Sequence, residues 1–301
     1  MGADKPTLLL TGGGGRLGGQ ITELLLARGG HRLIVTTRSP EKLADLARRG
    51  VEVRRLDFDD DVASIARALD GADRVLFISS VAIGRRAEQM AALVAGAKQA
   101  GVGHVLYTSA TSASPSRDSS IVSDHFWCEQ AIIASGIPWT LLRHNMYTEH
   151  ILLFLPPAVK ARRLRTALGE GARSYVTRAD CARADAAALA GTWNDCRIYD
   201  IGGPEALSTD ALLAITRELT GVTIEHVRTN DAEALAEFAA NNLPPGFPES
   251  AVGFDRYARY GYHAITAPAV EELTGVRPES VRSYLSQHVE LLRRGEANVD
   301  L

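Results

Sequence analysis

Cysteine is scarce in this chain. Its 301 residues include only three cysteines, Cys128, Cys181 and Cys196, which are scattered and form no C-x-x-C pair. Such spacing indicates neither a disulfide framework nor a zinc site. We therefore expect a protein without structural disulfides and without a bound metal.

A surplus of positive charge and long apolar runs are also missing. The formal net charge is −3, so no basic surface argues for nucleic acid as a partner, and the familiar nucleic-acid-binding motifs are absent. No apolar stretch reaches the roughly 18 residues of a membrane-spanning helix. The first apolar segment begins at Thr7, which leaves no room for a signal peptide. These absences predict a cytoplasmic protein that binds neither nucleic acid nor membrane.

The apolar residues, 46% of the chain, form short β-rich runs that alternate with helical patterns. The β-rich runs are Thr7–Leu10, Leu33–Thr37, Val51–Leu56, Arg74–Ser79, His104–Ser109 and Trp139–Leu142. The helical patterns between the later runs are Glu41–Arg49, Val62–Leu69, Arg85–Ala100 and Ser123–Ser135. Continuous apolar strands suit a sheet that is buried on both faces. The alternation therefore predicts an α/β fold with a Rossmann-like, doubly wound parallel sheet.

A glycine-rich run, Thr11–Gly19, follows the first predicted strand directly and opens a helical pattern. That helix is expected to place four apolar residues on one face: Leu17, Ile21, Leu24 and Leu25. Glycines in this context allow a tight turn, a close approach of the backbone to a pyrophosphate, and packing of the helix against the strand. Free N–H groups and the positive end of the helix dipole can then hold the anion. The run thus predicts a dinucleotide-binding loop.

Two glycine spacings fit this loop. Gly12, Gly15 and Gly18 give the spacing G-x-x-G-x-x-G, which we take as the key set, whereas Gly13, Gly15 and Gly18 give G-x-G-x-x-G. The alternative is a flexible loop that binds nothing. The cofactor-binding residues predicted here are Thr11, Gly12, Gly15, Arg16, Leu17 and Gly18.

The end of the second predicted strand indicates which dinucleotide is bound. In NAD-binding folds of this type, an acidic residue about 20 positions past the glycines takes the ribose hydroxyls. Here the sequence reads Thr36-Thr37-Arg38-Ser39, with no acid. A guanidinium suits a 2′-phosphate, because the two groups form parallel charge-assisted hydrogen bonds. Arg38, with Arg16 as a second positive charge, therefore predicts NADP(H), unless both are solvated surface arginines.

Further cofactor contacts are predicted where the third and fourth strands end. Asp57 can accept a hydrogen bond from the adenine amino group while Phe58 packs near the ring; a solvated acidic loop is the alternative. Ser79 and Ser80 close the fourth strand, where the chain passes the cofactor at the carboxyl edge of the sheet. These two serines either contact ribose or phosphate or cap the next segment.

The regular alternation stops after about residue 143. Strand and helix patterns then return in pieces: a strand and a helix over Tyr175–Ala190, a strand over Arg197–Ile201, a capped helix over Ser208–Thr220 and an amphipathic helix over Ser280–Leu292. We predict an NADP(H)-binding Rossmann domain over residues 1–143. A mixed α/β region over residues 144–301 would complete the fold and cover the substrate pocket. The boundary is not sharp, and the two regions are expected to form one compact unit.

Motifs spread over nearly the whole chain point to one family. They are Thr11-Gly12-x-x-Gly15-Arg16-Leu17-Gly18, Leu76-Phe77-Ile78-Ser79-Ser80, Tyr107-Thr108-Ser109, Ile137-Pro138-Trp139-Thr140-Leu141-Leu142-Arg143, Tyr147-Thr148-Glu149, Val176-Thr177-Arg178-Ala179-Asp180 and Leu273-Thr274-Gly275-Val276-Arg277-Pro278. The chain resembles the NmrA-like group of atypical short-chain dehydrogenases. Within that group it is most similar to bacterial NADPH-dependent quinone reductases and triphenylmethane reductases.

This resemblance implies NADPH as the cofactor, a cytoplasmic enzyme and a homodimer. It puts the glycine loop and Arg38 at the NADP site, and Thr108 and Ser109 beside the nicotinamide. It also puts three residues in the segment that lines the nicotinamide and substrate pocket: Arg143, Asn145 and Tyr147.

The residues that could donate a proton differ from those of ordinary short-chain dehydrogenases. Ordinary short-chain dehydrogenases use a Tyr-x-x-x-Lys pair, in which tyrosine gives the proton and lysine lowers its pKa. The corresponding helix here carries His125 and Glu129, and Gln130 stands where many of the relatives have lysine. A quinone accepts hydride readily, so orientation and a dry pocket could suffice. Otherwise His125 or Tyr147 is catalytic and protonates a carbonyl or activated alkene, unless His125 is structural and bonded to Glu129.

Three functions are consistent with these residues. The leading hypothesis is an NADPH-dependent oxidoreductase that transfers hydride to a quinone or a similar conjugated planar acceptor. The second is a redox-sensing regulator of the NmrA type that binds NADP(H) without turning it over. The third is a pathway-specific ketone, imine or benzylic-ether reductase of specialised metabolism.

Overall fold

The computed structural model describes residues 5–116, 120–192, 195–240 and 247–297, and it divides into two compact units. The first comprises residues 1–115, 120–143 and 181–199, and the second comprises residues 116–119, 144–180 and 200–301. One transition between the units thus falls after residue 143, while residues 181–199 return to the first unit. In the described ranges, no helix has the length and apolar character needed to cross a membrane.

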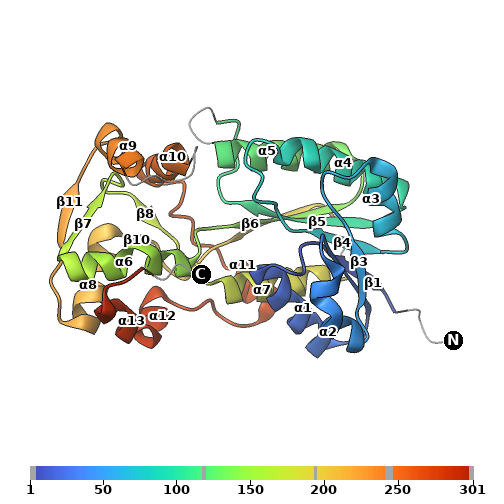
Figure 1. The fold of residues 1–301 in the computed structure, drawn as a ribbon, viewed down its shortest axis with the longest axis horizontal. Helices are drawn as coiled ribbons and strands as arrows, with labels where there is room; N and C mark the ends of the chain where they lie inside the picture. The colour runs from blue at the N-terminus through green and yellow to red at the C-terminus, as the bar shows by residue number, and fades with distance from the viewer. Residues whose placement is uncertain (1–4, 117–119, 193–194, 241–246, 298–301) are drawn as a thin grey trace. The chain divides into compact units, whose positions relative to one another are not determined.

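The first unit is built on a seven-stranded sheet in the order β3-β2-β1-β4-β5-β6-β9 (Figure 1). The strands are β1 (Thr7–Leu10), β2 (Arg32–Thr37), β3 (Glu52–Arg55), β4 (Arg74–Phe77), β5 (His104–Ala110), β6 (Trp139–His144) and β9 (Arg197–Ile201). β1 pairs in parallel with β2 and with β4, so that Leu9 lies opposite Ile34 on one side and Val75 on the other. The predicted Rossmann-like parallel sheet is confirmed. The strand order reverses between β1 and β4, and ligands of such sheets bind at this position.

Helices cover both faces of this sheet. Figure 1 shows α3, α4 and α5 on one face and α1, α2 and α7 on the other. Their bounds are α1 (Arg16–Arg28), α2 (Ala44–Arg48), α3 (Val62–Leu69), α4 (Arg86–Gln99), α5 (Ser120–Ala134) and α7 (Arg178–Leu189). On α1, Leu17, Ile21 and Leu25 are buried, whereas Leu24, predicted on the same face, is 36% exposed. Leu24 stands at the edge of the apolar stripe rather than at its centre.

Two helices that the sequence predicts as continuous are divided. The stretch predicted over Glu41–Arg49 is a 3₁₀ turn, η1 (Pro40–Leu43), followed by α2, because Leu43 leaves helical geometry at φ −108° and ψ 21°. The helix predicted over Ser280–Leu292 is divided into α12 (Val281–Gln287) and α13 (Val289–Arg294) by His288, at φ −115° and ψ 17°. In both places the apolar periodicity continues across a local backbone break.

The second unit has an apolar core of its own, formed by buried residues between Ile151 and Leu292. Its elements are η2 (Thr148–His150), α6 (Ile151–Ala161), β7 (Arg163–Thr166), β8 (Ala172–Arg173), β10 (Leu207–Ser208), α8 (Thr209–Thr220), β11 (Glu225–Arg228), α9 (Asp231–Ala240), α10 (Phe247–Arg259) and α11 (Ala269–Thr274), besides α12 and α13. β7 pairs in parallel with β11, and β8 pairs antiparallel with β10. The helix predicted after Ser208 is confirmed, with the Ser208 hydroxyl accepting from the Ala211 N–H. The strand predicted at Tyr175 is reduced to a single bridge between Tyr147 and Val176.

Candidate functional site

The glycine loop joins β1 to α1 at the point where the strand order reverses. Gly12 has φ +67°, a conformation that favours glycine. Gly15 is the residue that precedes α1, and it carries no side chain to accept from the first-turn N–H groups. Gly12 and Gly15 are also exposed. The positive end of α1 is therefore open to an anion, as a pyrophosphate site requires.

Two other glycines in the loop are required by packing. A Cβ on Gly18 would overlap the carbonyl oxygen of Gly12, and a Cβ on Gly13 would overlap the side chain of Val35. A Cβ on Gly15, in contrast, would meet within 4 Å only the Gly12 oxygen, at 3.2 Å. Both glycine spacings read from the sequence thus have a structural reason. Gly13 and Gly18 let α1 pack closely, whereas Gly12 and Gly15 shape the exposed turn.

Hydroxyl groups tie the strand ends together beside this loop. The buried Thr11 Oγ1 accepts from the Ile78 N–H at 2.9 Å and donates to the Leu76 carbonyl at 3.3 Å. Thr108 Oγ1 accepts from the Ser79 N–H at 2.9 Å. The ends of β1, β4 and β5 are therefore fixed relative to one another, so the surface against which a dinucleotide would bind is rigid.

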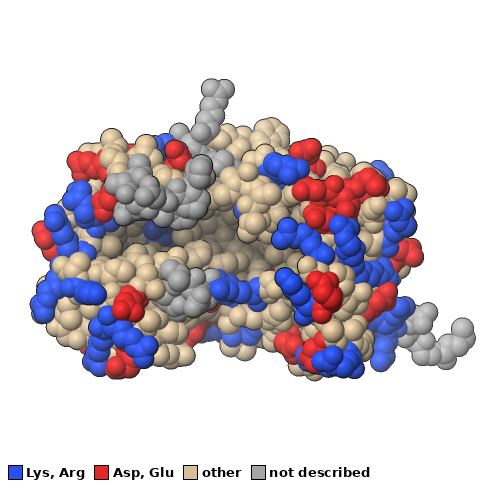
Figure 2. All heavy atoms as spheres, in the orientation of Figure 1, with Lys and Arg blue, Asp and Glu red and all other residues tan. Residues whose placement is uncertain are grey.

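Arg16 and Arg38 are both exposed. In the part of the chain that the structure describes, neither guanidinium has a hydrogen-bond or ion-pair partner. Figure 2 shows acidic side chains next to basic ones on the face that it draws. A hydrogen bond from Gln89, followed by the charges of Arg85 and Arg38, lowers the pKa of Asp59. The region around Arg38 can therefore accept a further anion such as a 2′-phosphate.

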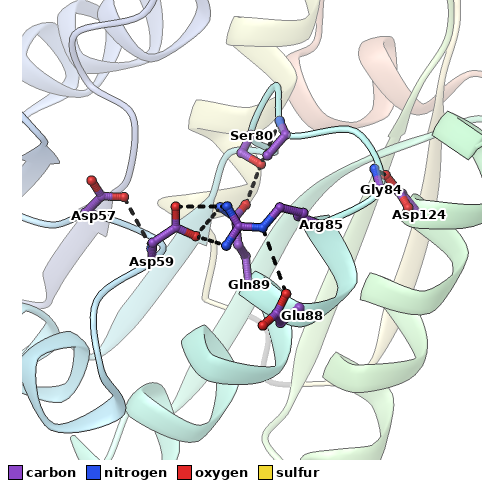
Figure 3. A network of polar contacts seen from close by, with 9 residues as sticks. Asp57, Asp59, Ser80, Gly84, Arg85, Glu88, Gln89 and Asp124 are labelled. Carbon is purple, nitrogen blue, oxygen red and sulfur yellow. Dashed lines mark hydrogen bonds and ion pairs between the residues drawn. The ribbon is translucent and has the colours of Figure 1, made fainter. Parts of the chain in front are cut away.

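The segments that follow β3 and β4 are linked by a polar network (Figure 3). Asp59 forms an ion pair with Arg85 at 2.9 Å and accepts from Gln89 Nε2 at 2.9 Å. Ser80 Oγ donates to Gln89 Oε1 at 2.7 Å. The carboxylate of Asp57 accepts from the Asp59 N–H at 3.2 Å. The predicted cofactor residues Asp57 and Ser80 are thus held in place by neighbours that the sequence did not single out.

Phe58 and Ser79 belong to the same region. Phe58 is half-buried and packs against the core of the first unit. Together with Ser79 and Ser80 it lines a small cavity that extends towards Tyr107 and Cys128. The four predicted residues that follow β3 and β4 therefore lie on one side of the sheet's carboxyl edge.

The helix α5 carries a buried carboxylate that is already paired. Glu129 is 1% exposed, and its carboxylate accepts hydrogen bonds from Arg143 Nε at 2.8 Å and from Arg143 Nη2 at 2.7 Å. Ser109 Oγ donates to the same carboxylate at 2.6 Å. β5 and β6 bring these two partners beneath α5. A buried carboxylate needs charged and hydrogen-bonding partners, and this one obtains them from Arg143 and Ser109, both predicted cofactor residues.

His125 on α5 makes a close contact with a residue of β5. His125 Nδ1 lies 2.9 Å from the hydroxyl of Tyr107, and both residues are buried. Burial also raises the pKa of Tyr107 well above its ordinary value, so this hydroxyl stays protonated at neutral pH. The Tyr107 partner comes from β5, and no helical spacing within α5 could have predicted it.

The remaining predicted residues, Asn145 and Tyr147, lie in the second unit. Asn145 is buried, with Nδ2 donating to the His263 carbonyl at 3.0 Å and Oδ1 accepting from the Met146 N–H at 2.8 Å. The Tyr147 hydroxyl lies 3.2 Å from His144 Nδ1, and the Arg178 guanidinium carbon lies 5.1 Å from the centre of the Tyr147 ring. The sequence assigned no role to His144 or Arg178. Arg178 does belong to one of the family motifs, Val176-Thr177-Arg178-Ala179-Asp180, and that motif was the one feature of the sequence that could have pointed to it.

Comparison with known protein families matches residues 12–191 to the NAD(P)H-binding family. The chain belongs to that family. The matched range begins in the glycine loop and covers all of the predicted cofactor-binding residues except Thr11. The loop leaves the positive end of α1 open, and the guanidinium groups of Arg16 and Arg38 are exposed and have no partner among the described residues. The loop and these two arginines therefore fit a dinucleotide.

The chain is similar to oxidoreductases over nearly its whole length. It is 30% identical to quinone oxidoreductase 2 of Escherichia coli over 255 residues, 84% of this chain and 88% of that protein. The structure of the NADPH-dependent quinone oxidoreductase QOR2 from Escherichia coli complexed with NADPH has a TM-score of 0.86 at 28% identity, covering 95% of this chain and 99% of that one. The Citrobacter sp. triphenylmethane reductase complexed with NADP(H) has a TM-score of 0.84 at 27% identity, covering 93% and 99%.

A more distant likeness shows the fold alone. The structure of Nmra, a negative transcriptional regulator, has a TM-score of 0.76 at 15% identity and covers 97% of this chain and 98% of that one. Taken together, the comparisons confirm the predicted family resemblance and the NAD(P)H cofactor. They also confirm that the chain is an NAD(P)H-dependent oxidoreductase.

The two kinds of glycine in the loop can be separated by matched substitutions. We expect Gly18→Ala to lower the melting temperature by several degrees, because its methyl group would overlap the Gly12 backbone. Gly15→Ala should unfold close to wild type and yet bind NADPH at least ~10-fold more weakly, because its methyl group stands where a phosphate would approach. Thermal unfolding and calorimetric titration with NADPH measure the two effects. Unchanged NADPH affinity in Gly15→Ala would contradict the assignment of this loop.

The ion pair between Arg143 and Glu129 should be costly to break from one side. We expect Arg143→Met to lower the free energy of unfolding by roughly 3–5 kcal/mol, because it leaves a buried carboxylate without its cation. The double variant Arg143→Met/Glu129→Gln should recover a large part of that loss. Urea unfolding of the wild type, both single variants (Arg143→Met and Glu129→Gln) and the double variant forms a double-mutant cycle. This cycle measures the interaction free energy between Arg143 and Glu129. If the double variant is no more stable than Arg143→Met, the charge of Glu129 is not what Arg143 balances.

Proposed function

We propose that the protein transfers hydride from NADPH to a quinone or a similar conjugated planar acceptor. The observation that carries this proposal is an intact dinucleotide loop combined with an α5 helix that lacks the tyrosine–lysine pair. Of the two residues at the corresponding positions, Glu129 is committed to Arg143 and Ser109, and His125 Nδ1 lies against Tyr107. A strongly electrophilic acceptor needs little acid catalysis, and the relatives include a quinone oxidoreductase over 84% of this chain.

NADPH is the preferred cofactor in this proposal. Bound NADPH would supply the hydride, and the chain's own residues would bind and orient it. The N–H groups at the start of α1 hold the pyrophosphate, while Arg38, assisted by Arg16, takes the 2′-phosphate. Asp57 accepts from the adenine amino group and Phe58 packs on its ring. Arg38 supports this choice because its guanidinium is exposed and has no partner in the described ranges.

The other predicted residues would surround the nicotinamide and the substrate. Ser79 and Ser80 would contact the ribose and phosphates, and Thr108 and Ser109 would border the nicotinamide. Arg143 and Asn145 would line the pocket, with His125 or Tyr147 as the catalytic acid. The hydrogen bonds already made by Ser109, Arg143 and Asn145 support a positioning role, in which these side chains keep the pocket rigid.

The resemblance to the NmrA-like group supports the remaining parts of the proposal. These are a small planar or aromatic substrate, a cytoplasmic location and a homodimer. The region from residue 144 onwards would contribute the cover of the substrate pocket, and the Rossmann domain would contribute the cofactor.

Turnover tests the function directly. We expect the purified protein to oxidise NADPH in the presence of quinones, faster than enones or aryl ketones, and to use NADH less well. The Gly15→Ala variant, prepared identically, controls for contaminating reductases and should lose most of the rate. Tight NADPH binding without turnover on any member of the panel would contradict the proposal and favour a sensor or an untested pathway substrate.

The assignment of Arg38 predicts a change in cofactor preference. Arg38→Asp should weaken NADPH binding roughly 100-fold, because charge-assisted hydrogen bonds contribute about 1.5–3 kcal/mol and the new carboxylate repels the phosphate. NADH binding should change by no more than a few-fold. Arg28→Asp, at the far end of α1, makes the same change in net charge and serves as the control. An equal loss for both cofactors would show that Arg38 does not meet the 2′-phosphate.

A further inference from the structure

We propose that Tyr147 donates the proton in the reaction and that Arg178 and His144 position and activate it. This inference rests on the proposed function, in which the segment after β6 lines the substrate pocket. It goes beyond that function because it gives roles to Arg178 and His144.

The backbone fixes Tyr147 and Arg178 together although they are 31 positions apart in the sequence. Tyr147 bridges to Val176, the Thr148 N–H donates to the Val176 carbonyl at 2.9 Å, and the Val176 N–H donates to the Met146 carbonyl at 3.0 Å. Both oxygens of Glu149 then accept from the Arg178 N–H, at 2.9 and 3.2 Å. The distance between the tyrosine ring and the arginine is therefore set by a short, fully bonded piece of backbone.

The charge of Arg178 is directed at the Tyr147 ring. Its guanidinium carbon lies 5.1 Å from the ring centre, and the guanidinium forms no hydrogen bond or ion pair with any other described residue. The nearby carboxylate of Glu149 is 8% exposed and accepts from the backbone of Arg178. A cation over a ring attracts its negative face, and it attracts a phenolate more strongly because the charge is full. Arg178 thus favours loss of the phenol proton.

His144 contacts the hydroxyl end of the Tyr147 side chain. Its Nδ1 is 3.2 Å from the Tyr147 hydroxyl, and the residue is 7% exposed. An imidazole at this distance can orient the hydroxyl and exchange a proton with it. His144 is therefore a positioning residue and a proton relay rather than a group that touches the substrate.

Two further ionisable residues lie near Tyr147 and Arg178, namely His150 and Tyr284. The ring of His150 lies 5.6 Å from that of Tyr147. Burial, followed by the charges of Arg178 and Arg173, lowers the pKa of His150 to about 4, so it is neutral at pH 7. From α12, Tyr284 interacts electrostatically with Glu149 and Arg178, and burial raises its pKa to about 12.

The proposed step balances as follows. The acceptor gains one hydrogen and two electrons as hydride from NADPH, and the oxygen that becomes negative takes a proton from the Tyr147 hydroxyl. The phenol O–H bond breaks, a new O–H bond forms on the product, and the phenolate is stabilised by Arg178. His144, or water through it, then returns a proton to Tyr147. The products are NADP⁺ and the reduced, protonated acceptor.

Ionisation of Tyr147 can be measured without cofactor or substrate. Tyrosinate absorbance of the purified protein is followed against pH, and the matching Tyr147→Phe protein is subtracted to isolate this residue. We expect the midpoint to rise by about one pH unit or more in Arg178→Met, and Arg178→Lys to restore part of the difference. Arg217→Met, an exposed arginine on α8, should leave the midpoint unchanged. An identical midpoint in wild type and Arg178→Met would overturn the inference.

Turnover then tests whether this phenol serves the reaction. With a weak carbonyl acceptor, Tyr147→Phe and Arg178→Met should each lower kcat about 10-fold or more while NADPH affinity is kept, and the double variant should be no slower than Tyr147→Phe. If the wild type turns over and Tyr147→Phe matches it on every acceptor, this inference fails and the proposed function stands. If the wild type binds NADPH and reduces nothing, both fail together.

Discussion

The close contact between the start of α1 and the glycine turn is the constraint on which the rest of the site depends. Gly18 lies so near the Gly12 backbone that no side chain fits between them. This brings the open end of the helix to the point where the sheet order reverses, between β1 and β4. An exposed helix end offers N–H groups and positive potential together. The loops after β2, β3 and β4 then only need to supply the groups that distinguish one dinucleotide from another.

Helix α5 keeps its place in the Rossmann-like fold although it lacks the tyrosine–lysine pair of ordinary short-chain dehydrogenases. The position that would hold a cation beside a catalytic tyrosine instead holds a carboxylate, and Arg143 and Ser109 neutralise it from the neighbouring strands. A buried charge with good partners is stable where it is and is expensive to disturb. The Glu129 carboxylate is therefore held in place by its partners and is not available as a proton donor.

The second unit holds a contact between a tyrosine and a cation. Tyr147, His144 and Arg178 meet because a backbone bridge holds the start of α7 against the segment after β6. A tyrosine with a nearby cation is a recurring solution for donating a proton to a developing oxyanion. Here the two residues come from separate segments of the chain, so no short motif in the sequence reveals the contact between them.

The sequence by itself determined the doubly wound sheet and the dinucleotide loop, because each depends on residues adjacent along the chain. Alternating apolar runs and helical periods fix the fold class, and strand, glycine turn and helix fix the loop. It misjudged the division of two helices. Only the tertiary structure decided that Glu129 pairs with Arg143 and Ser109, and that Arg178 lies over Tyr147. Those contacts join residues far apart in the chain, and no local spacing encodes them.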